Sequence, residues 1–360
     1  MSSRITIVLP QLSAGGTERT AVELANYFEE NNVHVTLILL YKKEIFFELN
    51  SNIELIEPKW VPKTSFEKPF YFGFLLFYLN TSIRKSRPDS VLLLGYILIS
   101  LLSIIPNNYN VFFSNRTNPT RSRFGSNKLL NRTYHTLYRL VRNKVNGIIA
   151  QTQIVKDYYQ LKFSSPISVI PNSLKEMKYF PLIEKEEIAI TIGRAVPEKG
   201  QKSFVELVAK LKSSDLNLKF LLVGDGPELN NIKAYARELG VFDSIEFSGF
   251  QEGVDLYLAK AKYFLLTSIT EGYPNVLIEA MAHGCVPISF DCVAGPSDII
   301  DNGENGFLVE VGNINAMAEK ITLLANEPRY FELLSQNARK VRETNNRELL
   351  NKKWLDFILN

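Results

Sequence analysis

The sequence predicts an α/β protein made of two doubly wound domains, each a parallel sheet with helices on both faces. Three observations lead to this prediction. Strands and helices alternate along most of the chain, which is typical of parallel sheets with right-handed crossovers. The same alternation starts again after the middle of the chain. Finally, 360 residues are too many for one ordinary domain but suit two.

The elements of the first half follow from the spacing of apolar residues. Strands are expected over residues 4–10 and 33–40. The segment between them predicts a helix over residues 17–30, because its apolar residues recur at the i, i+3, i+4, i+7 spacing of one helical face. These residues are Ala21, Leu24, Ala25 and Phe28.

Two apolar stretches of the first half resemble membrane spans only superficially. Residues 69–79 and 91–105 are both shorter than the roughly 20 residues that cross a bilayer. Gly95 also interrupts the second stretch, which we expect to be a buried strand followed by a buried helix. The start of the chain runs directly into a strand and lacks the apolar core and cleavage site of a signal peptide.

The second half repeats the alternation, and glycines end two of its helices. Gly240 and Gly284 stand where a left-handed residue commonly closes a helix. Strands are expected over residues 187–193, 219–224, 245–249, 263–268, 286–291 and 306–310, and helices over 203–212, 227–239 and 274–283. The final segment, 329–360, predicts one or two helices with Trp354 and Phe357 on an apolar side. The expected domains are therefore residues 1–172 and 173–343, followed by a C-terminal helix over 344–360.

Charge is divided unevenly between the two halves. Residues 1–178 carry 22 Lys/Arg against 12 Asp/Glu, whereas residues 179–360 carry 19 against 26. No acidic residue occurs between Asp89 and Asp157. This excess of positive charge in the first half favours an anionic partner such as a phospholipid surface, a diphosphate-linked acceptor or a nucleic acid. The alternative is a solvated basic face that binds no partner. The basic residues in this stretch are Arg116, Arg121, Arg123, Lys128, Arg132, Arg139, Arg142, Lys144 and Lys156.

Several classes of protein are disfavoured by what the sequence lacks. Cys285 and Cys292 form no CxxC pair and no ligand cluster with the histidines, so a structural zinc site is not expected. The chain has neither GxGxxG nor GxxxxGK[ST], which argues against a nicotinamide dehydrogenase and a P-loop NTPase.

The first candidate site is the GRAVPEKG run at residues 193–200, between a strand and a helix. Its short loop lets Arg194 offer a planar fork of donors and Lys199 a compact charge to one anion, such as a nucleotide diphosphate. A tight turn with two surface cations is the alternative. Gly193 and Gly224 lie at the ends of two strands and Gly226 follows the second, where glycine lets backbone amides approach a ligand closely.

The strongest candidate is the run at residues 268–279. Glu271 falls in the loop after a strand and Glu279 on the following helix. A loop carboxylate accepts hydrogen bonds from sugar hydroxyls and a helix carboxylate does so from a ribose, while amides at the helix N-terminus face the diphosphate. Two solvated glutamates are the alternative. The other residues at this junction are Gly272, Tyr273, Pro274, Asn275 and Val276.

Two further candidates lie in the first half. Gly15 and Gly16 open the first helix, with Glu18 behind them, and amides there suit a phosphate. Asn115 and Arg116 follow the apolar strand 110–113, and we expect one of them to face the substrate. A flexible loop and an ordinary polar turn are the respective alternatives.

Together these motifs resemble the group 1 family of retaining GT-B glycosyltransferases, over nearly the whole chain. The E-x7-E element of the family matches Glu271 to Glu279, and its R-x4-K element matches Arg194 to Lys199. Its GGxE[RK] element matches residues 15–19, and its inter-domain IPN matches residues 170–172. Each string is common by chance, but the set in this order and spacing is not.

The resemblance implies two Rossmann-like domains facing a central cleft, with the last helix crossing back to the N-terminal domain. It also implies a nucleoside-diphosphate sugar as co-substrate, no cofactor, no required metal ion and retention at the anomeric carbon. Arg194, Lys199 and Glu271 would be catalytic. The donor would be bound by Glu279, by Tyr273, Pro274, Asn275 and Val276 at the start of its helix, and by Gly16, Gly193, Gly224, Gly226 and Gly272. Gly15, Glu18, Asn115 and Arg116 would lie on the acceptor or sugar side.

One departure from the family bears on the donor. Many relatives carry a histidine near the sugar in the N-terminal domain, whereas residues 114–119 contain none and resemble an SxRxxP variant. The GPSDII run at residues 295–300 resembles the same subset, which often uses UDP-linked hexoses or N-acetylhexosamines. The expected donor is therefore UDP-linked.

These features predict that the protein transfers a hexose or N-acetylhexosamine to a lipid-linked saccharide acceptor. The reaction would belong to the synthesis of a bacterial surface polysaccharide, such as lipopolysaccharide or capsule. The protein is expected in the cytoplasm, either free or bound peripherally to the anionic inner face of the cytoplasmic membrane. A non-catalytic sugar-nucleotide-binding subunit is an alternative. A basic nucleic-acid-binding protein is another, although no recognised nucleic-acid motif occurs and no nucleic-acid partner is expected.

Overall fold

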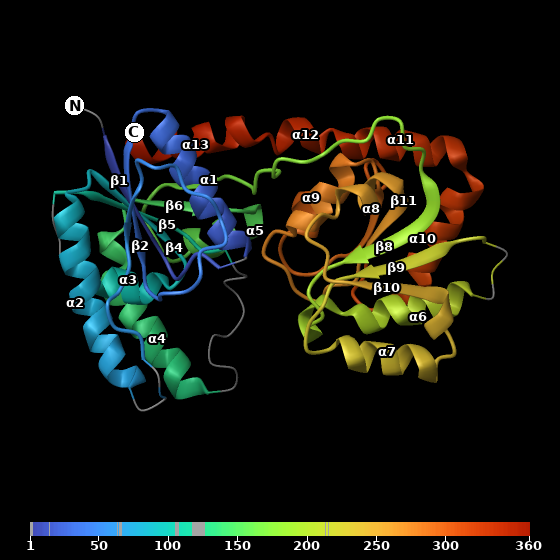
Figure 1. Ribbon diagram of the computed structural model, residues 1–360, viewed down its shortest axis with the longest axis horizontal. Coiled ribbons are helices and arrows are strands. Elements are labelled where there is room, and N and C mark those ends of the chain that lie inside the picture. Colours follow the sequence, from blue (N-terminus) through green and yellow to red (C-terminus); the bar gives the residue numbers. More distant parts are fainter. Residues whose placement is uncertain are drawn as a thin grey trace. The chain divides into compact units, whose positions relative to one another are not determined.

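The computed structural model describes residues 3–13, 15–62, 64, 67–104, 108–116, 127–212, 214 and 216–360. The chain divides into two compact units (Figure 1). The N-terminal unit consists of residues 1–172 together with 348–360, and the C-terminal unit of residues 173–347. Each unit holds one parallel sheet with helices on both faces, as the alternation of strands and helices predicted.

The sheet of the N-terminal unit has the strand order β3-β2-β1-β4-β5-β6-β7. The winding direction therefore reverses between β1 and β4. In open α/β sheets, loops at the carboxyl ends of strands beside such a reversal form the usual ligand crevice. The strands are β1 (Arg4–Leu9), β2 (His34–Leu39), β3 (Glu54–Ile56), β4 (Ser90–Leu94), β5 (Asn110–Ser114), β6 (Gly147–Ala150) and β7 (Ile167–Val169).

The alternation of side chains along each strand explains why both faces of this sheet are covered. In β1, Ile7 points into one core and Val8 into the other, because successive strand residues face opposite ways. Helices α1 and α13 close the first core, and α2, α3, α4 and α5 close the second (Figure 1). Their bounds are α1 (Gly16–Glu30), α2 (Lys68–Ser86), α3 (Ile97–Ser103), α4 (Lys128–Val141), α5 (Gln153–Gln160) and α13 (Arg347–Leu359).

The sheet of the C-terminal unit has the order β10-β9-β8-β11-β12-β13, so its winding reverses between β8 and β11. Helices α6, α7, α10 and α11 cover one face, and α8 and α9 cover the other. The strands are β8 (Glu186–Ile192), β9 (Lys219–Val223), β10 (Ile245–Gly249), β11 (Ala261–Leu266), β12 (Val286–Phe290) and β13 (Phe307–Val309). The helices are α6 (Gln201–Leu211), α7 (Leu229–Glu238), α8 (Asp255–Lys260), α9 (Asn275–Ala282), α10 (Ile314–Asn326) and α11 (Pro328–Arg339).

The end of the chain differs from the prediction in the number of its helices. Residues 329–360 were expected to form one or two, and the structure has α11, the short α12 (Val341–Thr344) and α13. The apolar residues of α13 recur every four positions, which places Leu350, Trp354 and Ile358 on one buried stripe in the core of the N-terminal unit. The last helix of the chain therefore completes the hydrophobic core that begins with β1.

The two apolar stretches of the first half belong to ordinary elements. Residues 91–104 contain most of β4 and all of α3, a buried strand followed by a helix as expected, and residues 70–79 lie within α2. Among the described residues, no helix is both long enough and apolar enough to cross a membrane.

Candidate functional site

The strand order of the C-terminal unit brings the predicted motifs to one edge of its sheet. The loops after β8, β9, β11 and β12 all leave from carboxyl ends of adjacent strands. Lys199 lies on the loop after β8 and Glu271 on the loop after β11, so these two loops flank the reversal between the two adjacent strands. Because ligands of open α/β sheets bind at such a reversal, this edge is the candidate site.

Glycines allow the loops after β8 and β9 to pack closely. A Cβ atom on Gly224 would overlap the carbonyl oxygen of Gly193, and one on Gly226 would lie 2.5 Å from the carbonyl oxygen of Ala195. Gly224 has φ of 140° and Gly226 has φ of 155°, a region that favours glycine. These two glycines therefore have a packing role that the sequence did not reveal, beside the amide role predicted for them.

Lys199 and Glu271 form an ion pair across the reversal. The Nζ atom of Lys199 lies 2.7 Å from Oε1 of Glu271, and the Glu271 side chain is only 9% exposed. Backbone contacts hold this pair in register, because Ile269 N–H donates to the carbonyl of Glu198 at 3.0 Å. Gly200, with φ of 59°, lets the chain pass close to the carbonyl of Thr267. The structure thus joins two residues that the sequence placed in separate motifs.

Arg194 lies on the same loop as Lys199, and its side chain is exposed. A buried residue that sequence reasoning missed holds this loop. Gln201, 3% exposed, donates from Nε2 to the carbonyls of Gly193 at 3.1 Å and Arg194 at 3.4 Å. Its signal in the sequence is a polar residue directly after Gly200 at the start of a helix. An exposed guanidinium on an anchored loop suits an anionic ligand.

The start of α9 is fixed by contacts on both sides. Pro274 is its N-cap residue, and Asn275 and Val276 open the helix. Gly295, with φ of 106°, lies against this junction, because a Cβ atom there would approach the Cδ of Pro274 to 2.6 Å. The buried Tyr273 hydroxyl accepts a hydrogen bond from Nδ2 of Asn345 at 2.8 Å, and burial raises its pKa. Gly272 completes the turn.

Glu279 lies on the second turn of α9 and is 6% exposed. Lys175, which sequence reasoning missed, places its Nζ atom 3.2 Å from Oε2 of Glu279. Each predicted carboxylate of the site therefore has its own lysine.

The glycine pair of the N-terminal unit lies at the corresponding reversal of the other sheet. Gly15 is the N-cap residue of α1 in an extended conformation, and Gly16 is the first residue of the helix. The Glu18 carboxylate folds back over Gly15, because a Cβ atom on Gly15 would overlap its Oε2 atom. An acidic group thus already lies beside the positive end of the α1 dipole.

Asn115 and Arg116 turn toward the interior of the N-terminal unit. Asn115 donates from Nδ2 to the Tyr159 hydroxyl at 2.9 Å. The Nη2 atom of Arg116 donates to Thr20 Oγ1 at 2.8 Å and to Asn172 Oδ1, and burial lowers the Arg116 pKa to about 9. Two other nitrogens of Arg116, Nε and Nη1, are buried without a hydrogen-bond partner. Their predicted role on the sugar side stays a prediction, and residues 117–119 of the SxRxxP variant lie outside the described residues.

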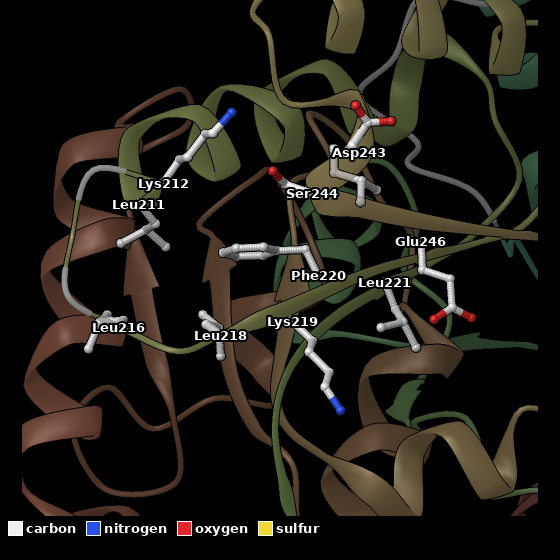
Figure 2. Close-up of a pocket in the computed structure, with 11 residues that line it drawn as sticks. Leu211, Lys212, Leu216, Leu218, Lys219, Phe220, Leu221, Asp243, Ser244 and Glu246 are labelled. Carbon is white, nitrogen blue, oxygen red and sulfur yellow. The ribbon is translucent and has the colours of Figure 1, made fainter.

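A hollow of about 470 Å³ in the C-terminal unit lies away from all these residues. Figure 2 shows its lining, which includes Phe220 and Lys219 at the amino end of β9 and Glu246 in β10. This is the sheet edge opposite to the loops of the motifs, so the hollow is no candidate for the same ligand. In the described part of the chain, no group of three or more His, Cys, Asp or Glu side chains is arranged to hold a metal ion.

Comparison with known proteins covers both units. Residues 14–175 match the family described as Glycosyltransferase Family 4, and residues 173–341 match the family described as Glycosyl transferases group 1. An uncharacterized glycosyltransferase of Haemophilus influenzae is 29% identical over 350 residues, which cover 95% of this chain and 96% of that protein. A Campylobacter jejuni α-1,4-N-acetyl-D-galactosaminyltransferase, named for a saccharide linked to PP-undecaprenol, is 24% identical over 99% of this chain and 98% of its own length.

A solved structure extends the comparison to the fold. A TarM variant of S. aureus, in complex with UDP among other ligands, has a TM-score of 0.81 and 15% identity over 99% of this chain and 100% of that one. This likeness confirms the predicted pair of Rossmann-like domains with a long C-terminal helix.

Proposed function

The chain belongs to the group 1 family of retaining GT-B glycosyltransferases, and we propose that it transfers a hexose or N-acetylhexosamine from a UDP-linked donor to a saccharide acceptor. The observation that carries this proposal is the Lys199–Glu271 pair beside Arg194 at the reversal of the C-terminal sheet. It combines cations for a diphosphate with a carboxylate for sugar hydroxyls in one place. The UDP complex of TarM and the GPSDII run support uridine as the nucleoside.

The role of each group follows from the charge that develops during the reaction. As the bond between the anomeric carbon and the phosphate oxygen breaks, negative charge grows on the leaving diphosphate. Arg194, Lys199 and the amides that open α9 stabilise that charge. An ammonium has three donors, so Lys199 keeps Glu271 as a partner while it binds a phosphate oxygen. Glu271 orients the sugar hydroxyls, and the leaving phosphate itself accepts the proton of the acceptor on the same face.

The acceptor is proposed to be a saccharide carried on a lipid diphosphate. The Campylobacter relative, whose name specifies a PP-undecaprenol-linked saccharide, supports this choice. Such an acceptor places the protein in the synthesis of a bacterial surface polysaccharide, at the inner face of the cytoplasmic membrane. The excess of basic residues in the first half of the chain supports an anionic acceptor or surface.

Binding of UDP is the direct test of the proposed donor. At a UDP concentration about 100 times its dissociation constant, binding stabilises the folded protein by about 2.7 kcal/mol, which raises the unfolding temperature. We expect UDP to raise it more than equal concentrations of GDP or ADP, and we expect UDP-hexoses or UDP-N-acetylhexosamines to be hydrolysed slowly without acceptor. A larger response to GDP or ADP would reject the uridine donor, and no response to any nucleotide would reject the donor site.

A membrane-facing surface is proposed on the outer sides of α2 and α4, which cover the same face of the N-terminal sheet. Phe77 of α2 is 71% exposed and Leu140 of α4 is 72% exposed, and Phe70 and Leu129 on the same helices are also exposed. Exposed Arg84, Lys85, Arg132 and Arg139 lie on these helices as well. Apolar side chains flanked by basic ones are typical of a surface that enters the headgroup region of an anionic membrane. Arg121 and Arg123 lie outside the described residues.

Sedimentation with vesicles tests this surface. We expect the protein to sediment with phosphatidylglycerol vesicles at low salt and to remain in solution at high salt, because exposed charges are screened. Phe77→Ser with Leu140→Ser should weaken binding, whereas Leu182→Ser, at a 96% exposed position of the C-terminal unit, should not. No sedimentation at low salt would remove the membrane surface and leave the enzyme proposal standing.

A further inference from the structure

Glu279 is a nearly buried carboxylate whose charge is matched by a lysine from another part of the chain. Its side chain is 8% exposed, and that of Lys175 is 26% exposed. A buried charge is costly unless it is paired, so the ion pair at 3.2 Å accounts for a carboxylate on the apolar helix α9. Glu271 shows the same arrangement with Lys199.

A single residue fixes both sides of the Lys175–Glu279 contact. The Asn345 carbonyl accepts a hydrogen bond from the N–H of Leu174 at 2.9 Å, which anchors the segment that carries Lys175. The Asn345 side chain donates to the hydroxyl of Tyr273, just before α9. Asn345 is 4% exposed, and Leu174 is itself buried in the core beneath α9. The lysine is therefore held by the same framework that sets the start of the helix.

We propose that Lys175 is a positioning residue for the nucleoside of the donor, acting through Glu279; this rests on the function proposed above. The ammonium engages Oε2 of Glu279 and restrains the side chain whose carboxylate would accept hydrogen bonds from the hydroxyls of a ribose. A carboxylate that is already held in place loses less conformational freedom when the ribose binds.

The pair also solves an electrostatic problem of the site. The donor carries a diphosphate, and a carboxylate on the helix whose N-terminus faces that diphosphate repels it. The charge of Lys175 cancels this repulsion locally, as the charge of Lys199 does for Glu271. Arg194 then remains as the net positive charge among these five side chains, which suits an anionic ligand.

The experiment compares the binding of UDP and 2′-deoxy-UDP by calorimetry in the wild-type protein and in three variants. Lys175→Met removes the charge with little loss of volume, Lys175→Arg keeps it, and Lys178→Met removes an exposed charge on the same segment as a matched control. Because the substitution releases the carboxylate that would hold the ribose, and hydrogen bonds to charged groups are the stronger ones, we expect Lys175→Met to weaken UDP binding at least about tenfold. Preference for UDP over its deoxy form should shrink, KM for the donor should rise, and kcat should change little.

The controls separate positioning from a structural role. Lys175→Arg is expected to restore most of the affinity, and Lys178→Met to behave as wild type. Unchanged UDP binding by Lys175→Met would overturn the proposal, as would equal losses of UDP and deoxy-UDP affinity, because the lysine would then act without Glu279. A wild-type protein that binds no nucleoside diphosphate would instead refute the proposed function, a result seen before any variant is compared.

Discussion

Arg194→Ala and Lys199→Ala are each expected to lower the turnover of sugar transfer by about 10²–10³-fold while the protein stays folded. Each substitution removes a cation that stabilises the charge growing on the leaving diphosphate, and that charge is largest in the transition state. The side chain of Arg194 is exposed, so its loss leaves the core intact. The measurement is the initial rate at saturating donor, with thermal unfolding of each variant recorded alongside.

Lys199→Ala has a second consequence that Arg194→Ala lacks. It leaves the Glu271 carboxylate, 9% exposed, without its ion-pair partner. We therefore expect Lys199→Ala to lower the unfolding temperature more than Arg194→Ala, since an unpaired buried charge is destabilising. The matched control is Lys202→Ala, which removes an exposed cation from the first turn of α6 and should leave turnover near that of the wild type. Near-normal transfer by both Arg194→Ala and Lys199→Ala would contradict their assigned roles.

Much of the candidate site was predictable because a parallel sheet places all carboxyl strand ends on one edge. The periodicity of apolar residues located the strands before Gly193, Gly224 and Glu271, and their loops meet in the structure as that rule requires. The contact between Lys199 and Glu271 was not predictable in the same way. It depends on backbone hydrogen bonding between the two loops and on the left-handed Gly200, neither of which leaves a pattern in the sequence.

The residues that sequence reasoning missed share a physical cause. Lys175 lies in a segment without helix or strand, so no periodicity indicates the direction of its side chain. Its partner Glu279 is distant in sequence, and the contact depends on Asn345 from a third segment. The same limit applies to Arg116, which was placed correctly after a strand. Its inward direction is set by Thr20 and Asn172.

Gly224→Ala is expected to destabilise the C-terminal unit by on the order of 3 kcal/mol and to abolish UDP binding, since it adds both backbone strain and overpacking. The new Cβ atom would overlap the carbonyl oxygen of Gly193, a backbone atom that cannot rotate away as a flexible side chain does. Relief of the clash requires the loops after β8 and β9 to separate. That separation moves the loop of Arg194 and Lys199 away from Glu271, so stability and donor binding should fall together.

Gly240→Ala provides the matched control, because it tests the strain of a left-handed residue without a clash. Gly240 has φ of 66°, and nothing lies within 4 Å of a Cβ atom built there. Its cost should be only about 1–2 kcal/mol, with UDP binding unchanged. Urea denaturation followed by UDP titration, at a temperature where all three proteins are folded, measures both quantities. Gly224→Ala could instead match Gly240→Ala in stability and bind UDP like the wild type. In that case close packing of the loops after β8 and β9 would not hold the site together, and their glycines would need another explanation.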